Sequence, residues 1–323
     1  MEGVIPESDQ FSRFSCRIAG LDCVVESHGL SSTQLGRFEP FIIPDWMVTD
    51  RSPVRSAVSE RIMRRLSHRH PRWGLPRLAL ESICHMMLDG FARRKVIAVS
   101  GVCIEYENCA YLFSSSSGSA ASNVPVDPFN AAKRYALLWR RYLGDGVRLV
   151  GSGWIALSEV HDGRDVYIAA SGTPWWIGSD WRSEAVTYPL GGWCFAGSAD
   201  AAHPGGGAPV ERADASTMVT QAMRCIYIPD DSRDAAIALG VLDRVLLLAS
   251  LYRMHAMAED SDGSDESDGH GGSVDESHLA ASFELLTGRS YEDARVEFPW
   301  PILSAERTWA SHDAGSAGVV GPQ

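Results

Sequence analysis

Lysine is scarce in this chain. Its 323 residues include only two lysines, Lys95 and Lys133, beside 27 arginines. Lysine is the usual cation of phosphate-binding loops and the amine of covalent amine catalysis. Any chemistry that requires a lysine therefore has two candidates here.

Long apolar runs are missing as well. No stretch reaches the roughly 18 apolar residues of a membrane-spanning helix, and the opening residues MEGVIPESDQFSR lack the basic-then-apolar pattern of a signal peptide. With 45% hydrophobic and 22% charged residues, the chain is long enough for one large or two modest globular domains. We expect a cytoplasmic protein that does not contact a membrane.

The cysteines form no CxxC pair. Their scatter argues against a disulfide framework and against a zinc ribbon, and we expect buried, reduced thiols. His161 and His203 have no HxxxH or similar metal spacing beside them, so no metal site is predicted. The seven cysteines stand at positions 16, 23, 84, 103, 109, 194 and 225.

Negative charge is concentrated in one segment. Of the net charge of −12, eight acidic residues lie between Glu259 and Glu276 with no Lys or Arg among them, which leaves −4 for the rest of the chain. This tract has too little apolar surface to offset its ordering entropy, so we expect a disordered loop at 259–277. A calcium loop is the alternative, but the EF-hand register is absent. No basic nucleic-acid footprint is present either.

Positive charge gathers between residues 51 and 72, in RSPVRSAVSERIMRRLSHRHPR. Two interpretations stay open for this segment. It is either a solvated helix face or linker, or a contact for a phosphate or an acidic partner.

Hydrophobic periodicity predicts strands that alternate with helices. Two hairpins are expected, one turning at Glu107-Asn108 and one at His161 to Arg164. Further strands are predicted at 14–26, 35–43, 187–198 and 251–257, and helices at 78–91, 211–224, 232–250 and 279–297.

These elements indicate an α/β fold with a mixed sheet and a small β-rich N-terminal unit. We divide the chain into four parts. They are the β-rich unit at 1–50, a helical connector at 51–92, an α/β core at 93–310 that contains the acidic loop, and a flexible tail at 311–323.

A predicted strand ends in the stretch SSSSGSAAS at 114–122, and a predicted helix follows. A turn of this kind presents several backbone N–H groups to one point, where they can bind an anion. The stretch is a candidate phosphate loop, with a plain flexible turn as the alternative. No His/Asp arrangement accompanies its serines as it would a catalytic nucleophile.

The sequence around this loop resembles the sequences of one family. CAYLFSSSSGSAAS, LLWRRYLGD, DGRDVYIAASGTPW and PLGGWCFA follow one another as in bacterial kinases of the HPr kinase/phosphorylase type, and the resemblance spans roughly residues 14–300. It implies a P-loop-type core shared with phosphoenolpyruvate carboxykinase. It also implies transfer of the γ-phosphoryl group of ATP, with magnesium, to a serine of a small protein or peptide.

Three charged features of that family are missing. Its loop reads like SGPSGTGKST, whereas alanines here replace the second glycine and the lysine, so that Gly118, Ser119 and Ser122 are the phosphate contacts the resemblance leaves. Gly151-Ser152-Gly153 stands where the family has the acidic pair that supplies the general base and positions magnesium.

The third loss follows GTPW, where Trp176-Ile177-Gly178 replaces a Ser-Gly-Lys sequence. Gly172 and Thr173 of that GTPW stretch remain as candidate cofactor contacts. Trp175, Trp176 and Trp181 are either the wall of a cleft for a base or peptide, or core residues.

The sequence contains candidates to replace the missing cations and carboxylates. About eleven extra residues precede LLWRRYLGD, and an alignment that places this insertion inside the loop brings Lys133 near the usual lysine position, with Arg134 and Arg182 as further cations. The alternative is an ordinary helix with a basic, solvated face. Glu159, Asp162 and Asp165 are candidate carboxylates, although such residues are typical of a hairpin turn.

Phosphoryl transfer depends on positioning and electrostatic stabilisation, so these losses remove the groups that supply the rate. We predict a degenerate HPr kinase-like protein, a pseudokinase that acts as a binding or regulatory module for a peptide or small protein, with no confident catalytic residue and no cofactor. The alternative is an active ATP- and magnesium-dependent serine kinase. A third hypothesis is nucleotide binding without chemistry. The oligomeric state stays open.

Overall fold

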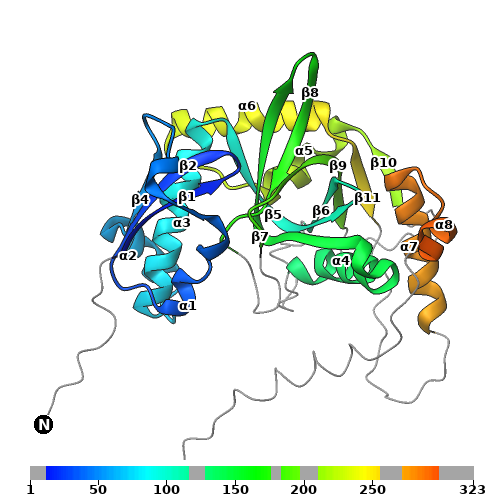
Figure 1. Cartoon of the computed structure of the whole chain (residues 1–323), viewed down its shortest axis with the longest axis horizontal. Coiled ribbons are helices and arrows are strands. Elements are labelled where there is room, and N and C mark those ends of the chain that lie inside the picture. The colour runs from blue at the N-terminus through cyan, green and yellow to red at the C-terminus, as the bar shows by residue number, and fades with distance from the viewer. Residues whose placement is uncertain (1–11, 116–127, 176–182, 197–209, 255–270, 298–323) are drawn as a thin grey trace, which may run out of the picture.

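The computed structural model describes residues 12–115, 128–175, 183–196, 210–254 and 271–297. Two sheets and the helices packed on them make up this structure (Figure 1). The mixed α/β class predicted from the sequence is confirmed.

The smaller sheet has the strand order β3-β1-β2-β4. Its strands are β1 (Ser12–Ile18), β2 (Leu21–Ser27), β3 (Ile42–Ile43) and β4 (Val54–Ala57).

The single strand expected at 14–26 is wrong, because the segment is a hairpin. Its two-residue turn, Ala19-Gly20, has positive φ angles of 52° and 73°, as the right-handed twist of a tight hairpin requires. The strand expected at 35–43 is also mostly wrong. The two residues of β3 follow the short helix α1 (Ser32–Leu35) and a 3-10 turn at Glu39–Phe41. A capping box between Ser31 and Gln34 stabilises the N-terminus of α1.

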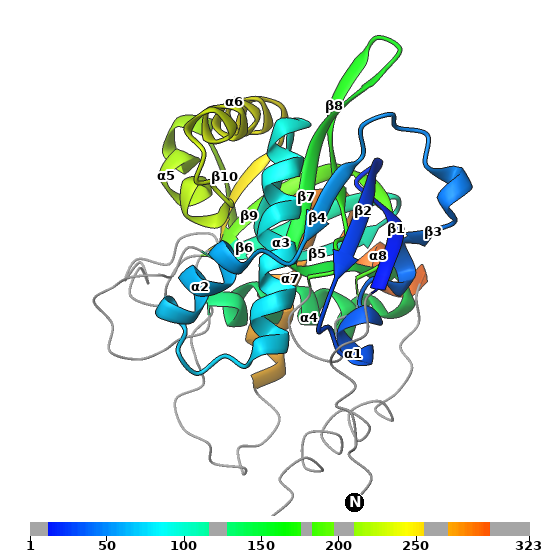
Figure 2. The same cartoon turned by 90° about the vertical axis from the view of Figure 1, so that its left-hand side faces the viewer.

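The small sheet continues past residue 50, where we expected the N-terminal unit to end. Strand β4 pairs in parallel with β2 and completes the sheet. The two helices that follow are α2 (Glu60–Arg69) and α3 (Leu75–Arg93). Figure 2 shows α3 alongside β4.

Helix α3 begins at Leu75-Pro76, where proline suits the first turn, and it contains the helix predicted at 78–91. Its apolar face joins the small sheet to the large one. Ile83, Met87 and Phe91 share one core with residues of both sheets, among them Val25 of β2 and Ala98 of β5.

The larger sheet has the strand order β10-β11-β9-β6-β5-β7-β8, and β9 also pairs with β8. Five strands, β9, β6, β5, β7 and β8, therefore form a closed circle of pairings. The strands are β5 (Val96–Tyr106), β6 (Cys109–Ser115), β7 (Val147–Asp162), β8 (Asp165–Ser171), β9 (Thr187–Ala196), β10 (Val210–Ala213) and β11 (Leu251–Met254).

Both predicted hairpins of the large sheet are confirmed. Glu107 and Asn108 connect β5 to β6 with φ angles of 51° and 62°, and the Asn108 N–H donates to Glu105 Oε1 at 2.6 Å. The turn between β7 and β8 falls at Gly163-Arg164, within the predicted stretch.

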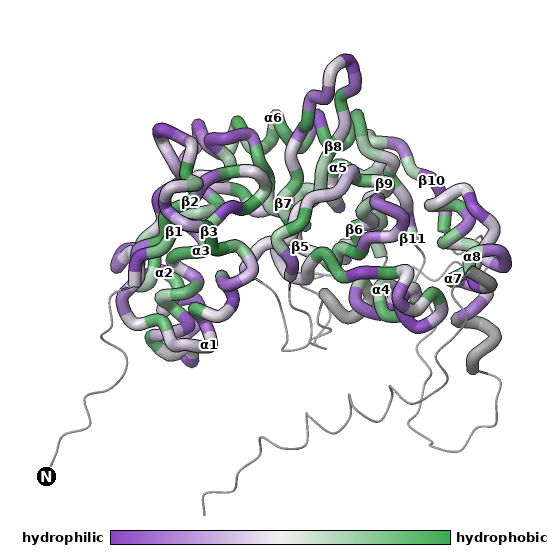
Figure 3. Tube along the Cα trace, viewed as in Figure 1, coloured by the Kyte–Doolittle hydropathy of each residue, from purple (hydrophilic) through white to green (hydrophobic). Residues whose placement is uncertain are grey.

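Helices cover both faces of the large sheet (Figure 1). On one face, the buried Trp139 and Phe283 belong to the core that includes residues of β5 and β6, and on the other face Leu242 and Val245 belong to the core that includes Trp193. The first face carries α4 (Pro128–Leu143), α7 (Gly271–Thr287) and α8 (Tyr291–Glu297), and the second carries α5 (Ala215–Cys225) and α6 (Ser232–Leu248). Figure 3 shows hydrophobic residues along the strands and hydrophilic ones at the tip of the β7–β8 hairpin.

Two expectations in this part of the chain need correction. The helix expected at 211–224 starts later, because Val210–Ala213 forms β10 and pairs with β11 at the sheet edge. The loop expected at 259–277 ends earlier, because α7 begins at Gly271, while 259–270 lies outside the described residues. Glu276 ties α7 to α8, since its carboxylate accepts a hydrogen bond from the Tyr291 hydroxyl at 3.3 Å and lies 2.6 Å from Arg295 Nη1.

All seven cysteines are free, and six of them are buried, as expected. Within the described residues, no helix has the length and hydropathy to cross a membrane.

Gly90 tests the packing of α3 on β4. A Cβ at Gly90 would lie 2.4 Å from Val54 Cγ1, and Val54 is a buried, branched side chain in a strand. Overpacking typically costs about 1–3 kcal/mol, which exceeds the roughly 1 kcal/mol of helix propensity that alanine adds. We expect Gly90→Ala to lower the free energy of unfolding measured in urea.

Gly240→Ala in α6 is the matched control. A Cβ built there meets no atom within 4 Å apart from the neighbouring backbone of its own helix, so this variant should raise the free energy of unfolding by about 0.5–1 kcal/mol. The same change in both variants would contradict the close contact between α3 and β4.

Candidate functional site

Three parallel strands of the large sheet end at one level. Ser115 at the end of β6 is paired with Ala196 at the end of β9, and Ala196 is paired with Met254 at the end of β11. In α/β proteins, ligands bind outside the carboxyl ends of such strands. We call this place the carboxyl edge, and the predicted phosphate loop follows β6 there.

Helix α4 begins beside the carboxyl edge. Its Tyr135 ring is stacked on Phe113 with ring centres 6.1 Å apart, and Trp139, one turn later, contacts Tyr111, which lies earlier in β6. The helix therefore runs antiparallel to β6. The strand before the predicted loop and the helix after it are those that the sequence predicted.

The predicted loop residues Gly118, Ser119 and Ser122 lie outside the described residues, as do Trp176, Trp181, Arg182 and His203. Lys133 is exposed in the second turn of α4. The structure thus brings the start of α4 to the carboxyl edge.

Gly172 and Thr173 are buried between backbone segments. A Cβ at Gly172 would lie 2.3 Å from the Glu184 carbonyl oxygen and 2.5 Å from that of Val150, so only glycine fits. The buried Thr173 hydroxyl donates to the Trp154 carbonyl oxygen at 2.5 Å. Both residues hold β7 and its neighbours together, and the Thr173 proton is engaged in that contact.

Gly151, Ser152 and Gly153 lie inside β7 and are paired with Gly101 to Cys103 of β5. A Cβ at Gly151 would lie 2.7 Å from Ser183 Oγ and 3.1 Å from Ile155 Cδ1. Gly151 therefore lies in a buried strand, and a side chain there would require Ser183 Oγ and the end of Ile155 to move.

The candidate carboxylates of the β7–β8 hairpin lie elsewhere. Glu159 follows Trp154 by five residues along β7, a distance of about 17 Å at roughly 3.3 Å per residue, while Trp154 is paired with Ser100 close to the carboxyl edge. Glu159 Oε2 accepts a hydrogen bond from Arg244 Nε at 2.9 Å, and its Oε1 lies 2.8 Å from His161 Nε2. The Glu159 carboxylate is therefore held by Arg244 of α6 and by His161 of its own strand.

Ser114 and Cys225, which lie near the carboxyl edge, are not activated nucleophiles. The Ser114 hydroxyl donates to the Ser100 carbonyl oxygen at 2.8 Å and accepts from Trp193 Nε1 at 3.0 Å. Burial raises the pKa of the nearby Cys225 thiol to about 11, so it is neutral at pH 7. Trp175 is also a core residue, packed edge-on against Phe38.

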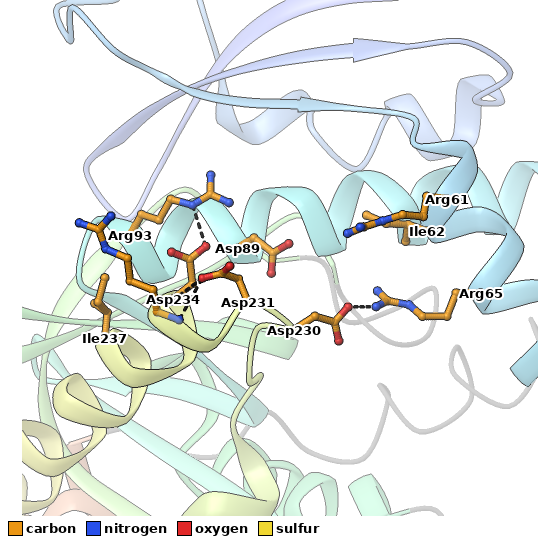
Figure 4. A pocket seen from close by; sticks show the side chains of 10 residues that line it. Arg61, Ile62, Arg65, Asp89, Arg93, Asp230, Asp231, Asp234 and Ile237 are labelled. Atoms are coloured by element: carbon orange, nitrogen blue, oxygen red, sulfur yellow. Dashed lines mark hydrogen bonds and ion pairs between the residues drawn. The ribbon is translucent and has the colours of Figure 1, made fainter.

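A second polar region lies between three helices. A cleft of about 620 Å³ opens between α2, α3 and the start of α6 (Figure 4). Its polar lining consists of Arg61, Arg65, Asp89, Arg93, Asp230, Asp231, Arg233 and Asp234. The sequence signalled only part of this cleft, through the basic segment at 51–72.

Behind the cleft, Tyr227 links α3 to the segment before α6. Its hydroxyl donates to Asp89 Oδ1 at 2.9 Å and lies 3.1 Å from His85 Nδ1. Because the tyrosine proton is directed at Asp89, Nδ1 of His85 must carry the ring proton that completes the second hydrogen bond. Burial raises the pKa of Asp89, and burial together with Arg65 and Arg69 lowers the pKa of His85 to about 4.

Metal binding has no support in the ranges that the structure describes, where no three His, Cys, Asp or Glu side chains lie close enough to hold an ion. Comparison with models of known protein families finds no match, and comparison with curated protein sequences finds no significant similarity.

Tyr227→Phe should lower the free energy of unfolding by about 1–2 kcal/mol, because it leaves Asp89 Oδ1 and His85 Nδ1 partly buried without their shared partner. Urea denaturation measures this change. The control is Tyr167→Phe in β8, whose hydroxyl makes no hydrogen bond to described residues. An equal effect of both substitutions would contradict the importance of the link.

His85 should make the fold acid-sensitive. Its folded pKa of about 4 lies below the ordinary value of 6.5, so the unfolded chain takes up a proton first and stability falls as the pH drops from about 6.5 towards 4. His85→Gln keeps a donor for Tyr227 without the titration. Urea denaturation at several pH values should show a shallower decline in the variant, and parallel curves would refute this assignment.

Proposed function

We propose that this chain is a catalytically degenerate HPr kinase-like protein that acts as a binding or regulatory module for a peptide or small protein. Two features support an HPr kinase-like scaffold. The family-like stretches follow one another in order along the sequence, and β6 ends at the carboxyl edge beside the start of α4.

The observation that carries the loss of activity is the packing of Gly151. An acidic residue at this point of β7 would collide with Ser183 and Ile155, which lie 2.7 and 3.1 Å from the position of a Cβ. A carboxylate is also expensive to bury without a partner. The packing at Gly151 therefore supports a β7 without an acidic side chain at this position.

The partners of the candidate polar side chains support the same conclusion. Magnesium and a triphosphate need carboxylates for the ion and cations for the phosphate oxygens. Ser114 and Thr173 are engaged in hydrogen bonds within the protein, and Glu159 is paired with Arg244. One electrostatic donor is typically worth about 100- to 1000-fold in rate, so loss of the loop lysine and of the acidic pair leaves little transfer.

Isothermal titration calorimetry with ATP, in the presence and absence of magnesium, tests the proposal. We expect no magnesium-dependent binding in the micromolar range. A phosphotransfer assay on serine-containing peptides should likewise give no product above background, while an active kinase of this type, assayed in parallel, labels its substrate. Magnesium-dependent micromolar binding with peptide labelling would instead establish the active serine kinase.

The two lysines provide a matched pair for the replacement hypothesis. Lys133→Ala removes the candidate cation of α4, and Lys95→Ala removes the lysine between α3 and β5. We expect the two variants to behave alike in the ATP titration. Nucleotide binding that is lost only in Lys133→Ala would show that Lys133 has replaced the loop lysine.

A further inference from the structure

The outward side of helix α6 carries a regular row of exposed residues. Figure 1 shows this helix along the top edge of the molecule. Five exposed residues of the helix follow one another in steps of three and four positions, so they lie on one side of it. We call this row the α6 stripe, and it consists of Arg233, Ala236, Gly240, Asp243 and Leu247.

The spacing of the α6 stripe is that of the a and d positions of a coiled coil, through which two helices pack. The opposite side of the helix is already used, because Val241 and Val245 belong to the core of the large sheet. The stripe is therefore a second packing face. Leu247 in the stripe is 64% exposed and Leu239 beside it is 37% exposed, which gives this face apolar surface in contact with solvent.

The middle of the α6 stripe is open to a close neighbour. Gly240 has no side chain and Ala236, one turn earlier, has a single methyl group. A Cβ built at Gly240 meets no atom within 4 Å apart from the neighbouring backbone of its own helix. Because the side chains at the contact set the distance between two packed helices, this centre permits a close approach of a second helix.

The charges of the α6 stripe complement one another in a single antiparallel register. Arg233 and Asp243 are exposed near its two ends, and neither side chain forms a hydrogen bond or ion pair with another described residue. The pair 233 and 243 and the pair 236 and 240 are both centred on Ala238. A second copy of α6 laid antiparallel about this centre brings Arg233 opposite Asp243 and Ala236 opposite Gly240, each contact twice.

This self-complementarity is what a twofold contact between identical chains requires. Arg244, the cation next to Asp243 in the sequence, does not disturb it, because Glu159 of β7 accepts hydrogen bonds from its Nε at 2.9 Å and its Nη2 at 3.3 Å.

We propose that α6 forms the contact of a homodimer, in which the α6 stripes of two copies pack antiparallel about a twofold axis at Ala238. Two reciprocal ion pairs between Arg233 and Asp243 fix the register, as complementary charges do at interfaces. Leu239, one residue from the centre, meets its counterpart from the second copy beside the axis. The proposal does not depend on the function proposed for the carboxyl edge.

Sedimentation velocity of the full chain over a micromolar concentration series tests the proposal. We expect the wild type to show a reversible equilibrium between monomer and dimer. Arg233→Asp alone, and Asp243→Arg alone, place like charges opposite each other at both ends of the contact. Each should raise the dissociation constant of the dimer at least about tenfold. Both substitutions are at exposed positions, and unchanged melting temperatures of the monomers would show that the variants are folded.

A mixture of the two single variants tests the register itself. The Arg233→Asp chain is acidic at both ends of the stripe and the Asp243→Arg chain is basic at both ends, so each should pair with the other and not with itself. We expect heterodimers in the mixture with a dissociation constant close to that of the wild type. Arg164→Asp in the β7–β8 hairpin makes the same charge change outside α6 and should dimerise as the wild type does.

Four results would overturn the proposal. They are a wild type that stays monomeric over the whole series, single variants that dimerise as the wild type does, a mixture no more dimeric than its two components, and an equal loss of dimer in Arg164→Asp.

Discussion

Strand β9 pairs with β6 along its second half and with β8 along its first three residues. This double pairing closes five strands into a circle and forces the backbones near Val150, Gly172 and Glu184 close together. The Gly172 N–H donates to the Val186 carbonyl oxygen at 3.3 Å, and the Glu184 N–H donates to that of Val150 at 3.2 Å. The glycines at 151 and 172 are a consequence, since a side chain at either position would meet neighbouring atoms.

The same constraint connects the fold to the proposed loss of activity. A kinase of the family this sequence resembles has charged side chains where β7 is packed with glycine and serine. An aspartate in place of Gly151 would have to displace Ser183 Oγ and the end of Ile155.

Polar chemistry in the described part of the molecule is concentrated in the cleft instead. Helices α2, α3 and α6 bring together four arginines and four aspartates, and the pairing between them is unequal. Ion pairs and a helix cap account for three of the carboxylates, whereas two guanidinium groups stay without partners among the described residues.

Local patterns were sufficient for the hairpin at Glu107-Asn108 and for helices α3 and α6, because turn residues and apolar spacing act over a few neighbouring positions. They failed where pairing with distant strands decides the structure, as for β4 and β10, and where α8 holds the start of α7. The cleft could not be predicted for the same reason. Arg61 and Arg233 are far apart in the sequence, and only the packing of α2 and α6 against α3 places them in one cavity.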